Sequence, residues 1–84
     1  MEKYKIQKTF LTRSSWWYLS RAKISDGEIY VPVGSNYNFH HAGRSEDDQL
    51  IIYNNLNDPV YLEMSRGTSR LLKDLEAQAN REVS

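Results

Sequence analysis

Residues 24–33 read Ile-Ser-Asp-Gly-Glu-Ile-Tyr-Val-Pro-Val and carry the clearest structural signal in the chain. Asp26-Gly27 separates two segments rich in aromatic and β-branched residues. This is the strongest short-range signal for a β-hairpin, because both central positions of a type I′ turn need a positive φ angle. Pro32 cannot donate a hydrogen bond to a neighbouring strand, so the second strand ends there or lies at an edge there. A two-residue hairpin is therefore the predicted centre of the fold.

The residues before this turn, 16–24, are predicted to form the first strand of the hairpin, because aromatic residues favour strands. A helix capped by Ser14 or Ser15 is the competing interpretation of the same residues, and the hairpin signal is preferred over it. Further upstream, residues 3–12 alternate apolar and polar side chains. This period of two predicts a strand with one buried face.

Two more strands are predicted downstream, over residues 50–53 and 60–64, because both runs are apolar and the residues between them are dense in turn formers. They predict a second hairpin. Residues 34–48 show no sustained periodicity. We expect them to form a long loop, and long loops are often functional.

The last element is predicted to be an amphipathic helix over about residues 69–82, capped by Thr68 or Ser69. Its apolar residues fall in one stripe at helical spacing: Leu71, Leu72, Leu75, Ala79 and Val83. The stripe could dock in a groove of a partner, but the sheet would then lack a cover, so packing on the sheet is preferred. The predicted fold is one α+β domain over residues 1–84, a small twisted antiparallel sheet of four or five strands with this helix on one face.

Composition narrows the function classes. The chain has 84 residues, eleven basic and eleven acidic side chains, and no cysteine. Disulfides, thiol catalysis and zinc–thiolate sites are therefore excluded. The longest apolar run, Trp16–Leu19, covers four residues, whereas a membrane span needs about 20. The N-terminus lacks the apolar core of a signal peptide, so we expect a cytoplasmic protein without a membrane partner.

The charges are segregated along the chain: residues 1–44 carry a net charge of +4 and residues 45–84 carry −4. Such halves could pair between two copies, and exposed edge strands also seek partners, so a homodimer is possible. The zero net charge argues against a dedicated nucleic-acid binder, because such domains are usually basic.

A metal-dependent hydrolase or nuclease is the third-ranked interpretation, centred on His40, His41 and Asp47. Imidazole and carboxylate groups are good metal ligands and acid–base catalysts. Adjacent residues of an extended chain, however, point to opposite sides, and no His-Glu-x-x-His or Asp-x-Asp-x-Asp pattern is present. We therefore expect a non-catalytic protein without a metal or another cofactor.

The aromatic content is the most informative feature, with two Trp, six Tyr and two Phe. A domain of this size cannot bury them all, and exposed Trp, Tyr and Arg dominate the binding energy of protein interfaces. The preferred interpretation is a protein-binding module, an inhibitor or adaptor of a larger protein or nucleoprotein complex. Small phage and mobile-element inhibitors, including anti-CRISPR proteins, share this general composition.

The predicted protein-binding residues are Trp17, Tyr18, Tyr30, Tyr37, Phe39, Glu46, Asp47 and Asp48. The last three, with Asp58 and Glu63, could imitate nucleic-acid phosphates toward a basic groove. The alternative is a nucleic-acid-binding regulator, because basic and aromatic residues interleave in the N-terminal half. Its predicted contacts are Lys3, Lys5, Arg13, Trp17, Arg21 and Lys23. If Trp16 and Trp17 lie on a strand, one faces the core and the other faces away.

Overall fold

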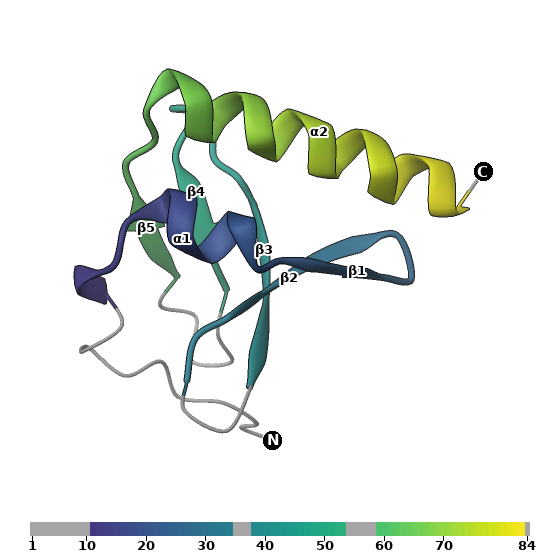
Figure 1. Cartoon of the computed structure of the whole chain (residues 1–84), viewed down its shortest axis with the longest axis horizontal. Coiled ribbons are helices and arrows are strands. Elements are labelled where there is room, and N and C mark those ends of the chain that lie inside the picture. Colours follow the sequence, from purple (N-terminus) through teal and green to yellow (C-terminus); the bar gives the residue numbers. More distant parts are fainter. Residues whose placement is uncertain (1–10, 35–37, 54–58, 84) are drawn as a thin grey trace.

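The computed structural model describes residues 11–34, 38–53 and 59–83 (Figure 1). In chain order its elements are α1 (Ser15–Ser20), β1 (Lys23–Ser25), β2 (Glu28–Pro32), β3 (Phe39–Arg44), β4 (Leu50–Ile52), β5 (Val60–Leu62) and α2 (Arg66–Val83). The predicted strand over residues 3–12 lies almost entirely outside the described residues. Neither described helix is long and apolar enough to cross a membrane.

The five strands form one antiparallel sheet in the order β1-β2-β3-β4-β5. Asp26 (φ 53°) and Gly27 (φ 76°) make the turn between β1 and β2, and Ser25 pairs with Glu28 across it. The predicted hairpin is thus confirmed, and β2 ends at Pro32. The second predicted hairpin is also confirmed, because β4 and β5 pair antiparallel. With α2 the sheet gives the predicted α+β fold.

Side-chain alternation divides the sheet into two faces. Ile29, Ala42 and Ile52 lie side by side across β2, β3 and β4. They share the buried core with residues of both helices: Tyr18, Leu19, Leu72, Leu75 and Ala79. Both described helices therefore pack on the same face. In Figure 1, α2 runs from the side of β4 and β5 toward the tip of the β1–β2 hairpin, where the chain ends.

The prediction of a strand over residues 16–24 is wrong for most of its length, because residues 15–20 form α1. The Ser14 side chain accepts a hydrogen bond from the Trp17 N–H at 3.2 Å and caps the helix, as the competing interpretation expected. Tyr18 and Leu19 are adjacent and both fully buried, which a helix allows and a strand with one buried face does not. The strand β1 is confined to the three residues before the turn.

The prediction of a loop over residues 34–48 is wrong as well, because β3 lies within it. The strand has little intrinsic preference for extended structure, since it reads Phe-His-His-Ala-Gly-Arg. It is formed by pairing on both sides, with Tyr30 opposite His41 on β2 and Ile51 opposite Gly43 on β4. Tertiary pairing overrides local propensity here.

The helix α2 begins at Arg66, one turn before the predicted cap. The Ser65 hydroxyl accepts a hydrogen bond from the Thr68 N–H at 3.3 Å, so Ser65 is the capping residue rather than Thr68 or Ser69. The buried Ser15 hydroxyl donates to the Glu63 carbonyl at 2.5 Å, which joins α1 to the segment that leads into α2. Packing of the helix on the sheet, rather than in a partner, is confirmed.

Replacing Tyr18 by Phe is expected to raise the free energy of unfolding by about 1 kcal/mol. The Tyr18 hydroxyl is buried and has no hydrogen-bond partner among the described residues, and an unsatisfied buried hydroxyl costs about 1–3 kcal/mol. Urea unfolding of Tyr18→Phe measures the change, with the exposed Tyr61→Phe as the matched control. A loss of stability in Tyr18→Phe would show that the hydroxyl contributes a favourable interaction.

Candidate functional site

The face of the sheet opposite the two helices carries most of the exposed and half-exposed aromatic side chains of the strands. We call it the aromatic face and define it by Lys23, Tyr30, Phe39, His41, Tyr53 and Tyr61. Strand register places these residues together, because Lys23 is opposite Tyr30, Tyr30 is opposite His41, and the Tyr53 N–H donates to the His41 carbonyl at 2.9 Å. One row of side chains thus crosses four strands.

The rings within this row are in contact. The His41 and Tyr53 rings stack, with 5.0 Å between their centroids and 16° between their planes. The Tyr30 and His41 rings are tilted by 51° at 5.7 Å. The Lys23 ammonium lies 4.4 Å from the centre of the Phe39 ring, within the range of a cation–π interaction. Contacts between neighbours restrict the side-chain rotamers, so the surface is preorganised.

Gly43 explains how Tyr53 reaches across the sheet. A Cβ atom at this position would lie 3.4 Å from Cε2 and 3.5 Å from the hydroxyl oxygen of Tyr53. A methyl group at this position would only touch the ring, whereas a longer side chain would compete with the Tyr53 ring for the space above β3. Tyr53 still exposes 40% of its surface, and Tyr61 on β5 exposes 53%.

The structure brings only part of the predicted protein-binding set together. Tyr30 and Phe39 lie on the aromatic face, and Tyr37 is outside the described residues. Tyr18 is fully buried in the core, so its predicted place in a binding surface is wrong: the helical turn of α1 directs it toward the sheet. Trp17 lies on α1, on the opposite side of the sheet.

Four residues of the aromatic face were missed as protein contacts: Lys23, which was predicted only as a nucleic-acid contact, and His41, Tyr53 and Tyr61. A signal for the two tyrosines was present, because Tyr53 is two residues from Ile51, which pairs with Tyr61. Residues so related share one face of a sheet. No comparable signal existed for His41, since its strand was not predicted.

The predicted nucleic-acid contacts separate into two places. Arg13, Trp17 and Arg21 meet at α1, with the guanidinium carbons of the two arginines 4.2 and 4.7 Å from the centre of the indole ring. We call these three residues the α1 cluster. Lys23 lies instead on the aromatic face, and Lys3 and Lys5 are outside the described residues.

The two histidines do not form one site, because they alternate on β3. His40 is 3% exposed on the helix-covered face, whereas His41 belongs to the aromatic face. Asp47 lies in the exposed turn between β3 and β4. Among the described residues there is no cluster of three His, Cys, Asp or Glu that could hold a metal ion.

His40 is expected to make stability depend on pH. Burial lowers the pKa of His40 below its ordinary value of 6.5, so in mildly acidic solution the unfolded chain binds a proton that the folded chain does not. The free energy of unfolding should therefore fall as the pH drops from about 7 to about 5.5, above the range in which ordinary carboxyl groups titrate.

Urea unfolding at several pH values measures this dependence. His40→Gln should flatten it. An identical pH dependence in the His40→Gln variant would contradict the assignment.

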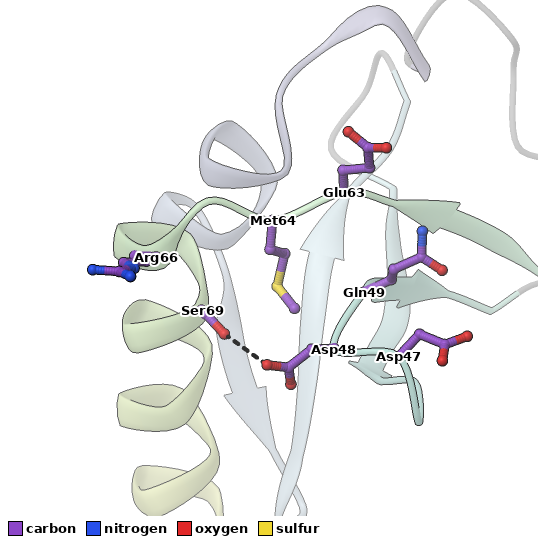
Figure 2. Close-up of a pocket in the computed structure, with 7 residues that line it drawn as sticks. All are labelled: Asp47, Asp48, Gln49, Glu63, Met64, Arg66 and Ser69. Atoms are coloured by element: carbon purple, nitrogen blue, oxygen red, sulfur yellow. Dashed lines mark hydrogen bonds between the residues drawn. The ribbon is translucent and has the colours of Figure 1, made fainter.

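Three acidic residues, Asp47, Asp48 and Glu63, line an open groove of about 520 Å³ between the β3–β4 turn and the start of α2 (Figure 2). Met64 points into this groove, and Asp48 faces Ser69 of α2. Asp47 and Glu63 point away from each other. The carboxylates therefore do not converge on one point, and the exposed Glu46, Asp47 and Asp48 lie apart from the aromatic face.

Asp48 is also engaged in an ion-pair network. Arg44, on the helix-covered face of β3, pairs with Asp48 and, at 3.0 Å, with Glu76 of α2. The hydrogen bonds to Glu76 contribute most to raising the pKa of Arg44. This network joins the β3–β4 turn to α2, so Asp48 has a structural partner within the fold.

Comparisons of the chain with models of known protein families, with curated proteins and with solved structures give no match.

Proposed function

We propose that the protein is a non-catalytic protein-binding module and that the aromatic face is its binding surface. The observation that carries the proposal is the row of contacting rings formed by Tyr30, His41 and Tyr53. Lys23 lies opposite Tyr30 at one end of this row, and its ammonium group contacts the Phe39 ring. The expected partner is a folded protein that presents apolar side chains to the rings and a carboxylate to Lys23.

The chemistry of the surface favours a protein over a polyanion. Tyrosine is enriched in protein interfaces because a rigid ring supplies apolar contact while its hydroxyl forms hydrogen bonds. The Tyr30 hydroxyl already donates to Glu28 at 2.7 Å, which adds a carboxylate beside the rings. With Lys23 as the one lysine or arginine among the defining residues, the aromatic face is close to neutral.

A non-catalytic role is supported by the separation of the acid–base groups. His40 and His41 lie on opposite faces of the sheet, and the nearby carboxylates do not converge. We therefore propose an inhibitor or adaptor that occupies a surface of a larger protein. The cysteine-free composition suits action in the cytoplasm.

The experiment is affinity capture from extract of the native cells with three tagged baits: the wild type, Tyr53→Ala and Trp16→Ala. Both substitutions remove an exposed ring, but Trp16 lies on α1, away from the aromatic face. Nuclease treatment of every sample removes indirect capture through nucleic acid. We expect a protein retained by the wild type and by Trp16→Ala and lost with Tyr53→Ala.

The captured protein is then purified, and its Kd is measured for each bait. Tyr53→Ala should weaken binding at least tenfold, as expected for an interface hot spot, while Trp16→Ala should leave the Kd unchanged. Equal affinities of Tyr53→Ala and the wild type would refute the proposed surface, as would the absence of any protein whose capture depends on Tyr53.

A further inference from the structure

We propose that α1 carries a second site, which binds the backbone of single-stranded nucleic acid through Arg13 and Arg21. This site goes beyond the proposed function because it lies on the helix-covered side of the sheet, opposite the aromatic face. It takes a different class of ligand and does not depend on the protein-binding proposal.

The two arginines of this site are preorganised by the Trp17 ring. Both guanidiniums of the α1 cluster contact one ring, that of Trp17. This ring is itself fixed, because its edge-to-face contact with the buried Tyr18 ring places the centroids 5.2 Å apart at 87°. Two long cationic side chains are thus both placed against one ring that packs on the core. A pair of arginines held in this way loses less side-chain entropy on binding an anion.

The α1 cluster carries two positive charges. Residues 13–21 contain Arg13 and Arg21 but no acidic residue, although the whole chain is neutral. Arg21 Nη1 donates to the Ser20 hydroxyl at 3.1 Å, which orients this guanidinium by a neutral group. Guanidinium groups bind phosphate oxygens in pairs of hydrogen bonds, so a positive surface of this kind fits a chain of phosphates.

An exposed indole beside Arg13 favours nucleic acid over other polyanions, and single strands in particular. Trp16 is 54% exposed and lines one open groove together with Arg13. The groove measures about 500 Å³, and Leu62 and Met64 make part of its wall apolar, while Glu63 adds one carboxylate to the same wall. An unpaired base can stack on an exposed indole beside a backbone-binding arginine, whereas a paired base cannot leave its helix as easily. An acidic protein would gain no such stacking.

The test uses fluorescence anisotropy of a dye-labelled oligothymidine of fifteen nucleotides, titrated with the full chain at several salt concentrations. The wild type should bind at low salt and lose affinity as salt rises. Arg13→Gln and Arg21→Gln should each lower the affinity and reduce the slope of log K against log salt by about 0.7, the value for one phosphate contact on a single strand. Arg70→Gln on the exposed surface of α2 is the matched control and should change neither quantity.

Trp16→Ala separates the ligand classes, because it should weaken oligothymidine binding without changing the salt slope. Circular dichroism melting of each variant establishes that it is folded. Three outcomes would overturn the proposal: no binding by the folded wild type at low salt, equal losses in Arg70→Gln and the α1 variants, or equally tight binding of polyglutamate that is insensitive to Trp16→Ala. The last result would assign the cluster to an acidic protein. None of them bears on Tyr53-dependent capture of a protein, so the two proposals fail independently.

Discussion

Truncating Leu72 to alanine is expected to lower the free energy of unfolding by about 2–5 kcal/mol, because it opens a cavity in a close-packed core. Leu72 is fully buried where α2 meets the sheet. A loss of this size is a large fraction of the stability of a small domain. We therefore expect the variant to be substantially unfolded at temperatures at which the wild type is folded.

Leu71→Ala provides the matched control, since Leu71 is adjacent on the same helix but only partly buried. The decrease in the free energy of unfolding should be clearly smaller for Leu71→Ala than for Leu72→Ala. Urea unfolding followed by circular dichroism measures both. If the two variants lost stability equally, the helix would not be oriented as described, and both proposed surfaces would lose their structural basis.

Replacing Gly27 by alanine should cost about 2–3 kcal/mol, for two separable reasons. Its φ angle of 76° lies in the left-handed region, where a side chain costs about 1–2 kcal/mol. In addition, a Cβ atom would lie 2.2 Å from Cγ1 of Val83 at the end of α2. The substitution also disturbs the hydrogen bond from the Gly27 N–H to Glu82, at 2.9 Å.

Combining Gly27→Ala with Val83→Ala separates the two contributions, because the second substitution removes the clashing methyl group but leaves the backbone unchanged. Thermal and urea unfolding should show partial recovery in the double variant relative to Gly27→Ala. Asp26→Asn is the control for the turn itself, since asparagine tolerates a positive φ angle, and it should be close to neutral. Full recovery in the double variant would contradict a backbone contribution.

The elements predicted correctly from the sequence are those whose signal is local. Asp26-Gly27 specifies its turn because few residue pairs tolerate two positive φ angles in succession. The apolar stripe of α2 is readable because it repeats at helical spacing from Leu71 to Val83, over about three and a half turns of a helix. In both cases the interactions that decide the structure lie within a few residues of each other.

The main errors in predicting secondary structure occurred where contacts between residues far apart in the sequence decide which element forms. The run from Trp16 to Leu19 is apolar at consecutive positions and fits either a strand or a helix, so the choice depends on the core that buries Tyr18. The strand β3 has weak local preference and forms because β2 and β4 pair with it on both sides. The start of α2 was displaced by one turn because Ser65 and Thr68 are both good capping residues.

For the candidate surfaces, too, local sequence signals predicted some features, whereas contacts between distant residues decided the others. Surplus aromatic residues predicted a binding surface, but its membership depends on the register of β3, which places His41 between Tyr30 and Tyr53. The meeting of Arg13 and Arg21 around Trp17 depends on the helical form of α1 and could not follow from a strand. Composition therefore indicated the kind of surface, and the long-range pairing decides which residues belong to it.

The strand order also has a consequence for how fast the chain folds. Every strand pairs with the strand that follows it in the sequence, so the sheet assembles through closures of short loops, which carry a low entropic cost. A much longer closure brings the end of α2 to the hairpin turn, where Gly27 and Glu82 are 55 positions apart. We expect docking of this helix to limit the folding rate, with the sheet transiently exposing its apolar face before the helix arrives.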